Sequence, residues 1–401
     1  MRPVTDRLKI SREKLSYIVD STAAPIAAVA FVTTWIGAEL SYIEDGIYTL
    51  GLKENAYDVF LHSLKYSFYP IFTLIFIFIL IMKKVEYGPM RKAEIKARKL
   101  SFDKIYNNSE GFSNKLNELD VPGNIKARWF NAVIPVSVVI LGTIAGLITT
   151  GLLETSWNNE LSFTKNLSLV IGHSDSYKAL LWSSLGGVLV AITLTLSQRI
   201  LSLKESVDSL INGFRTMLTA ILILILAWSL ALVTEHLHTA DYISRILIIV
   251  EISPYLVPAL TFILAALISF STGSSWGTMA ILDPLILPAS WLITSKYGFE
   301  YEESISIFYN VVSCVLAGSV LGDHCSPISD TTILSSLASS CNHIEHVRTQ
   351  LPYALTVGGI SIFIGTIPSA YGLQSWIILP VGIIIMFLIL SFFGKKIPAE
   401  N

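Results

Sequence analysis

The sequence is 401 residues long, with 52% hydrophobic residues, 14% charged residues and a formal net charge of -2. This balance lies outside the usual range of soluble globular proteins and indicates a chain embedded in a membrane. Nothing in the composition indicates a nucleic-acid surface, and the three cysteines lack the close pairing of zinc, redox or disulfide motifs.

The chain begins with a polar, basic stretch, residues 1–14, which has no apolar run behind its charges and so is not a signal peptide. A helix needs about 20 apolar residues to cross the hydrocarbon layer, where its backbone groups can be satisfied only internally. Seven clean segments qualify: 24–42, 63–82, 130–152, 180–196, 214–233, 352–371 and 376–393. The sequence therefore predicts an all-α, polytopic membrane protein.

The hydrophilic segment 83–128 holds eleven of the twenty-eight Lys and Arg residues in the chain. Because cytoplasmic loops carry an excess of these residues, the segment is expected in the cytoplasm, as an amphipathic connector. Counting outward places residues 1–14 on the same side, and residues 44–62 and 153–176 on the far side. The expected location is the inner membrane of a prokaryote.

The interval 255–341 is equally apolar but is interrupted twice. The first interruption is Ser271-Thr272-Gly273-Ser274-Ser275-Trp276-Gly277-Thr278, in which two glycines and a run of hydroxyls weaken the helix. Unwound backbone at this depth must be buried in protein or line a wet cavity. Its oxygens suit a small cation such as sodium, and a helix starting near Thr278 would offer its positive end to an anion. The alternative is a packing motif of small residues.

The second interruption is Gly322-Asp323-His324-Cys325-Ser326-Pro327-Ile328-Ser329-Asp330-Thr331-Thr332. Ionisable groups at this depth normally face a partner or an aqueous pathway. Gly322 and Pro327 are expected to break the helix, and Asp330 to cap a second half-helix. A carboxylate in this setting can bind either sodium or a proton, which is the simplest basis for cation/proton exchange. The alternative is that Asp330 is only a cap and that Asp323 and His324 form an internal ion pair.

Two other carboxylates are either site residues or structural residues. Asp283, followed by Pro284, is either a third carboxylate of the site or part of a structural turn. Asp20, which precedes the first long apolar segment, is either a site residue or a helix cap at the membrane interface.

Both interruptions closely resemble the signature stretches of the NhaC-type sodium/proton antiporter family, within the ion transporter superfamily. Residues 2–6 and the stretch Asp20-Ser21-Thr22-Ala23-Ala24-Pro25 are similar to the middle of that family's first repeat. The resemblance runs along essentially the whole chain. It implies two inverted repeats with discontinuous or re-entrant helices, divided here into residues 1–233 and 234–401. Members usually continue upstream of the position of Met1 with an acidic broken helix, and this sequence is expected to lack that half-repeat. The two interpretations are an N-terminally shortened product of an internal start and a protein that functions with an incomplete first repeat.

The leading hypothesis is secondary active exchange of sodium for protons by alternating access. Asp323 and Asp330 would be the exchanging carboxylates, and His324 would tune the proton affinity. The remaining expected site residues are Thr272, Gly273, Ser275, Thr278, Ser326, Ser329, Thr331 and Thr332, with Asp20 and Asp283. The expected sodium ligands among the site residues are Asp330, Asp323, Ser326 and Thr272. No cofactor is expected beyond the transported sodium and protons, and the expected partners are the lipid bilayer and a second copy in a homodimer.

Two other functions are weighed against this one. A sodium- or proton-coupled carrier of a small organic anion or amino acid would hold the substrate carboxylate at the helix end near Thr278. A membrane hydrolase would use Asp323, His324 and Ser326, but this spacing alone does not place a nucleophile against a base.

Overall fold

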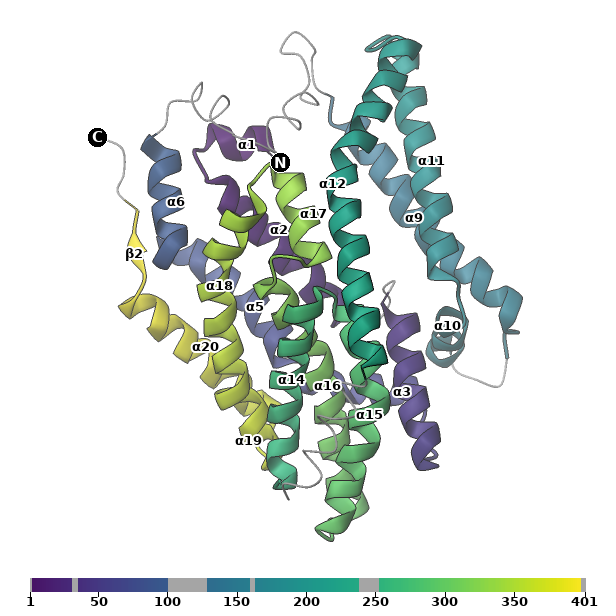
Figure 1. Ribbon diagram of the computed structural model, residues 1–401, viewed down its shortest axis with the longest axis vertical. Helices are drawn as coiled ribbons and strands as arrows, with labels where there is room; N and C mark the ends of the chain where they lie inside the picture. Colours follow the sequence, from purple (N-terminus) through teal and green to yellow (C-terminus); the bar gives the residue numbers. More distant parts are fainter. Residues whose placement is uncertain (1, 31–34, 100–127, 159–162, 238–251, 398–401) are drawn as a thin grey trace. The chain divides into compact units, whose positions relative to one another are not determined.

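The computed structural model describes residues 2–30, 35–99, 128–158, 163–237 and 252–397 (Figure 1). These residues are almost entirely helical, which confirms the all-α class. Within the described ranges the regular strands are β1 (Val85–Glu86) and β2 (Lys395–Lys396), which pair antiparallel with Val85 opposite Lys396.

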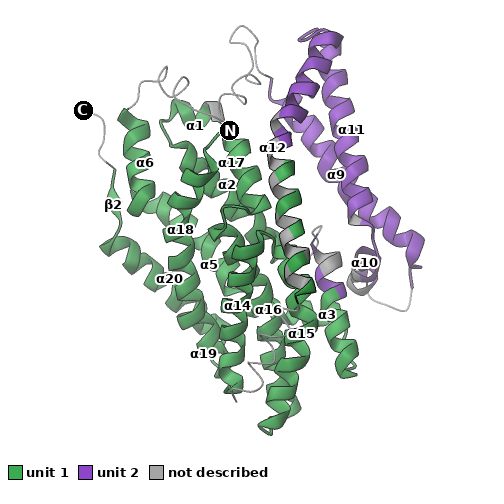
Figure 2. Cartoon of the chain, viewed as in Figure 1, with its two compact units in different colours: residues 1–30, 42–114, 220–401 green, residues 31–41, 115–219 purple. Residues whose placement is uncertain are grey.

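The chain divides into two compact units, residues 1–30, 42–114 and 220–401 in the first and residues 31–41 and 115–219 in the second (Figure 2). Besides the strands, the elements that lie wholly in the first unit are α1 (Arg2–Arg7), α2 (Arg12–Ala27), α4 (Ala56–Ser63), η1 (Leu64–Tyr66), α5 (Phe68–Lys83), α6 (Gly88–Lys99), η2 (Pro254–Leu256), α14 (Val257–Thr272), α15 (Ser275–Lys296), α16 (Tyr301–Cys325), α17 (Asp330–Ser339), α18 (His343–Ile360), η3 (Ser361–Thr366), α19 (Ile367–Ala370) and α20 (Ser375–Phe392). The second unit holds α9 (Phe130–Glu154), α10 (Phe163–Gly172) and α11 (Ser176–Ser197). Two helices have residues in both units, α3 (Ile36–Leu50) and α12 (Leu203–His236).

Among the described residues, seven helices are long and apolar enough to cross a membrane. An eighth span results if the pair Ala56–Tyr66 and Phe68–Lys83, bent by 46°, is counted as one crossing. A polytopic membrane protein is therefore confirmed. The expected repeat relationship stays a prediction.

The first apolar segment differs from its prediction. Instead of one span over residues 24–42, α2 ends at Ala27 and α3 begins at Ile36. The apolar run extends across this interruption because hydropathy alone does not mark a helix end. Residues 44–62, predicted as a loop on the far side, lie largely in α3 and α4. Of the basic segment 83–128, residues 88–99 form α6 and residues 100–127 lie outside the described ranges.

In the second unit, α9 packs against α11 through small residues. A Cβ atom added at Gly146 would lie 2.8 Å from the Cβ of Ala179, and one at Gly142 would lie 3.0 Å from the Cβ of Ser183. Small residues let helix backbones approach closely, which is the usual way helices associate in lipid.

In the first unit, α16 is the central helix and packs against both α14 and α15 (Figure 1). Every residue of α16 from Asn310 to Cys325 is buried. A Cβ at Gly322 would lie only 2.4 Å from the backbone oxygen of Ala266 in α14, and a Cβ at Gly318 would lie as close to that of Phe262. Gly322 was expected to break the helix, and this prediction is wrong: the helix continues to Cys325, and the glycine permits the close approach of α14.

Candidate functional site

The first interruption is a two-residue break between α14 and α15. Gly273 ends α14 in the left-handed conformation, with φ +67°, which favours glycine. Ser274 then caps α15, because its Oγ accepts a hydrogen bond from the backbone N–H of Gly277 at 3.1 Å. The new helix starts at Ser275 rather than near Thr278, so only one of the two glycines lies at the break.

The second interruption is the segment Ser326–Ser329 between α16 and α17. Ser329 is the N-cap residue and Asp330 the first residue of α17, so the expected cap at Asp330 is displaced by one position. The two breaks touch each other. Ser326 Oγ donates to the backbone oxygen of Phe270 at 2.8 Å, and a Cβ at Gly273 would lie 2.6 Å from the backbone oxygen of Ile328. The structure thus brings together the two stretches that the sequence singled out.

Asp323 lies in the last turn of α16, fully buried, and its carboxylate is held by the first break. Ser269 Oγ donates to Oδ1 at 3.0 Å. On the other oxygen, Oδ2 accepts a bond from the Ser275 hydroxyl and one from the Ser275 backbone N–H at 3.3 Å. The carboxylate therefore occupies the positive N-terminal end of α15, where a negative charge is stabilised.

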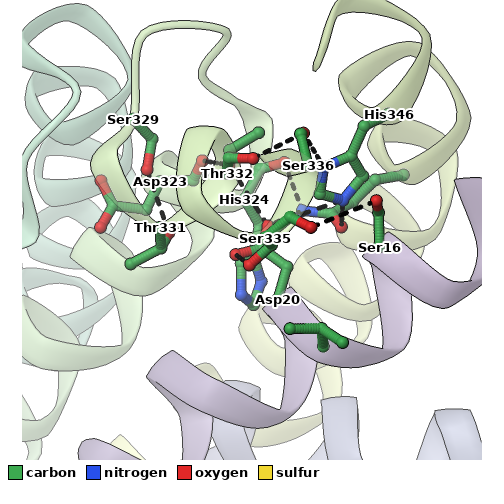
Figure 3. Close-up of polar contacts among 12 residues, drawn as sticks. Ser16, Asp20, Asp323, His324, Ser329, Thr331, Thr332, Ser335, Ser336 and His346 are labelled. Carbon is green, nitrogen blue, oxygen red and sulfur yellow. Dashed lines mark hydrogen bonds and ion pairs between the residues drawn. The ribbon is translucent and has the colours of Figure 1, made fainter. Parts of the chain in front are cut away.

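Asp20 faces the second break from α2, and its side chain is fully buried (Figure 3). Its carboxylate accepts hydrogen bonds from Thr332 at 3.2 Å, from Ser335 at 3.3 Å and from the amide of Gln350 at 2.7 Å. Asp20 lies in the middle of α2, whose N-cap is Ser11. The alternative that Asp20 is a helix cap is therefore wrong.

The hydroxyl of Thr332 lies between the carboxylate of Asp20 and the backbone of Asp323. It contacts Oδ2 of Asp20 and also lies 3.1 Å from the backbone oxygen of Asp323. Asp330, the first residue of α17, is partly buried. Its Oδ1 accepts a hydrogen bond from the backbone N–H of Thr331 at 2.7 Å. Asp323 interacts electrostatically with both Asp330 and Asp20. Three carboxyl groups thus converge where α2, α16 and α17 meet.

His324 is buried next to this cluster without bonding to the Asp323 side chain. Its Nδ1 shares a hydrogen bond of 2.8 Å with the Tyr69 hydroxyl of α5. The alternative of an internal ion pair between Asp323 and His324 is wrong, because the Asp323 carboxylate bonds to Ser269 and Ser275 and the His324 ring bonds to Tyr69. A hydrolytic set is not formed either, because Ser326 donates to the Phe270 backbone.

The other predicted site residues take local roles. Thr272 and Thr278 donate to backbone oxygens of their own helices, at Ile268 and Ser274. The hydroxyls of Ser329 and Thr331 bond to each other at 3.1 Å.

Asp283 stands apart from this cluster. It is buried in the middle of α15, eight residues and so about 12 Å along the axis from Ser275. The alternative of a structural turn at Asp283 and Pro284 is wrong, because the helix runs through both residues.

Sequence reasoning missed five residues of the network. They are Ser269, Ser335, Ser336, His346 and Gln350, which bond to the carboxylates or to each other. A signal existed for α18: Gln350 opens a stretch that matches residues 14–18, and polar residues recur at His346 and Gln350, four positions apart on one helix face.

Buried carboxylates at helix breaks inside apolar spans are typical of membrane transport proteins. Comparison with known proteins agrees. The model of the Na+/H+ antiporter family matches residues 26–367, and the chain belongs to that family.

Three relatives show the range of this similarity. An uncharacterised protein of Haemophilus influenzae is 33% identical over 359 residues, which cover 89% of this chain and 63% of the relative. The arginine/ornithine antiporter of Halobacterium salinarum is 35% identical over 112 residues, 27% of this chain and 21% of that protein. The malate-2H+/Na+-lactate antiporter of Bacillus subtilis is 26% identical over 168 residues, 41% of this chain and 33% of that protein. No solved structure matches the chain. The chain thus spans less than two thirds of the length of these relatives.

Proposed function

We propose that this protein exchanges sodium for protons at the cluster formed by Asp323, Asp330 and Asp20. The observation that carries the proposal is the convergence of three carboxyl groups at two touching helix breaks, with Asp20 and Asp323 fully buried. Within the described residues, no Lys or Arg side chain forms an ion pair with any of the three.

Such a cluster requires compensating positive charge. Burial disfavours each ionised carboxylate, and like charges close together disfavour one another. A bound sodium ion or a bound proton relieves both effects. A cation that binds first lowers the negative charge of the cluster and so weakens the binding of a second cation. Sodium and protons therefore compete for the cluster, and this competition is the basis of exchange.

The sodium ligands would be Asp323 and Asp330 with the hydroxyls of Ser326 and Thr272. Each of these two hydroxyls donates its hydrogen to a backbone oxygen, which leaves oxygen lone pairs for a cation. Sodium is a hard cation, for which carboxylate, hydroxyl and carbonyl oxygens are suitable ligands. His324 lies beside them and is proposed to influence proton binding through Tyr69.

Reconstitution into proton-tight vesicles tests this function. With the wild-type protein, sodium added outside should raise the pH inside the vesicles as protons leave in exchange. The variants Asp323→Asn and Asp330→Asn should abolish this change, because an amide keeps the shape but carries no charge. The control is Asp208→Asn, since Asp208 is exposed on α12. Undiminished sodium-driven proton movement in the Asp323→Asn protein would refute the proposal.

A second candidate is exchange of a small organic anion or amino acid coupled to sodium or protons. It is favoured by two relatives, whose names give arginine/ornithine and malate/lactate exchange. The helix end that was expected to bind a substrate carboxylate is instead occupied by Asp323. A substrate would therefore need another anchor, which favours the sodium/proton alternative.

Thermal stability separates the two candidates. If the protein exchanges only sodium and protons, its melting temperature should not change on addition of arginine, ornithine, malate or lactate, either in sodium buffer or in potassium buffer. A rise with one of them, larger in sodium, would favour the carrier instead.

The proposed orientation places the basic end of α6 in the cytoplasm. The described cysteines, Cys314, Cys325 and Cys341, are free and buried, so a cysteine introduced at exposed Lys92 can be labelled selectively. An impermeant maleimide should label Lys92→Cys in inside-out membranes and not in intact cells. Labelling in intact cells would reverse the orientation. The homodimer remains a proposal, to be tested by the mass of the purified protein.

A further inference from the structure

The polar network continues beyond Asp20 to a histidine that the proposed exchange does not yet use. His346 lies one turn into α18, and its side chain, like that of Asp20, is fully buried. Its Nε2 lies 2.9 Å from Oε1 of Gln350 and 3.9 Å from Oδ2 of Asp20. Its Nδ1 lies 2.8 Å from the hydroxyl of Ser336 in α17 (Figure 3).

The contacts of Gln350 determine what Nε2 of His346 must carry. The Gln350 amide nitrogen faces two acceptors, Oδ2 of Asp20 at 2.7 Å and the backbone oxygen of His324 at 3.0 Å. The amide oxygen therefore faces His346, and an oxygen accepts only. Nε2 of His346 must then carry a hydrogen in every protonation state.

The contacts of Ser336 allow two states at the other ring nitrogen. Its single hydroxyl hydrogen can point to Nδ1 of His346, or to the backbone oxygen of Thr332 at 2.7 Å. In the first arrangement His346 is neutral. In the second, Nδ1 must itself donate to Ser336, so His346 carries two hydrogens and a positive charge. The histidine can therefore gain or lose a proton through rotation of one hydroxyl, with both ring nitrogens hydrogen-bonded in each state.

The charges around His346 make the charged state useful. Asp20 on α2 provides the compensating negative charge, while His324 on α16 and His343 on the same helix interact with His346 electrostatically. Other charged groups on the surrounding elements have partners elsewhere: Arg12 with Asp6, Lys14 with Glu86, Glu94 with Ser11, Arg348 with Glu345, and Asp323 and Asp330 in the carboxylate cluster. Glu13 interacts with Lys96, and Lys83 of α5 contacts Ser391.

We propose that His346 holds the exchanged proton beside Asp20, at a site separate from the sodium ligands around Asp323. This inference rests on the proposed sodium/proton exchange. Sodium entering at Asp323 and Asp330 adds a positive charge. This charge repels the charged imidazole of His346, which is connected to the cluster through Gln350 and Asp20. His346 then releases the proton from Nδ1, the Ser336 hydroxyl turns toward the ring, and the total charge of the two sites is unchanged.

Calorimetry on the purified full-length chain tests this role without transport. Sodium is titrated in buffers of different ionisation enthalpy, and the dependence of the heat on the buffer gives the number of protons released per sodium bound. The wild type should release about one proton. His346→Gln should still bind sodium but should release no more than about half as many protons per sodium as the wild type. The matched control His343→Gln, at a half-buried position three residues away, should match the wild type.

The outcomes separate this inference from the function on which it rests. If His346→Gln binds sodium and releases as many protons as the wild type, His346 is a structural residue and the inference is wrong, while the proposed exchange stands. If the wild type does not bind sodium, both fail. If His346→Gln misfolds and so loses sodium binding, the variant Ser336→Ala provides a second test of the inference. It keeps the histidine but removes the acceptor of the charged state, so proton release should fall, and unchanged release would overturn the inference.

Discussion

Replacing Gly322 by alanine would place a methyl group where α16 and α14 touch through their backbones. The added Cβ would lie 2.4 Å from the backbone oxygen of Ala266 and 2.8 Å from the backbone nitrogen of Phe270. Ordinary contacts are at least 1 Å longer than the first of these, and backbone atoms cannot rotate away. The two helices would therefore have to separate by about 1 Å, which is a form of overpacking that costs roughly 1–3 kcal/mol.

The separation would also affect the site. The hydrogen bond from Ser269 to Asp323 spans the same helix contact and measures 3.0 Å. An increase of about 1 Å would stretch it to about 4 Å and so break it, because hydrogen bonds between oxygen atoms are usually about 2.5–3.0 Å long. Gly322→Ala should therefore lower both the melting temperature and the rate of sodium-driven proton exchange.

The control for this substitution is Gly359→Ala in α18, where an added Cβ meets no atom within 4 Å. Since alanine is the better helix former by about 1 kcal/mol, this variant should be as stable as the wild type or more so. Thermal unfolding in detergent, followed by flux in vesicles, measures both effects. The reasoning is refuted if Gly322→Ala melts at the temperature of Gly359→Ala and retains full exchange.

Two further predictions concern one hydroxyl and one helix cap. Thr332→Val keeps the shape of the side chain but removes its bond to the charged carboxylate of Asp20 and its contact with the backbone oxygen of Asp323. Because a hydrogen bond to a charged group contributes about 1.5–3 kcal/mol, half-maximal exchange should need about tenfold more sodium, whereas Thr193→Val on the exposed side of α11 should change nothing. At the start of α11, the backbone N–H of Lys178 donates to Asp175 and holds the pKa of that carboxyl below its ordinary value of 3.8. The stabilisation is therefore present above that value and is lost as the pH falls through the folded-state pKa. Asp175→Asn should flatten the fall in melting temperature on acidification, and an unchanged slope would contradict this account.

Much of the site was predictable from the sequence because polar runs are conspicuous inside apolar segments. Residues around Gly273 and around Pro327 do form the two breaks. Where each helix restarts was less predictable, because Ser274 and Ser329 compete with neighbouring hydroxyls as N-caps. Gly322 looked like a helix breaker, but its role depends on α14, which no local pattern shows.

The environment of Asp20 could not be predicted because it depends on contacts over 300 residues away in the chain. Thr332, Ser335 and Gln350 reach its carboxylate from α17 and α18. Hydropathy also merged the end of α2 with α3, since most residues between them in the sequence are apolar. Periodicity reveals which residues share a helix face, but it does not show which other helix that face meets.

The affinity for sodium as a function of pH tests most directly whether sodium and protons compete. It can be measured by equilibrium binding of radioactive sodium to the purified protein. Competition predicts that the apparent dissociation constant rises as the pH is lowered, by up to about tenfold per pH unit for each proton displaced. Sodium affinity that stays constant over a pH range in which the protein remains folded would contradict the account.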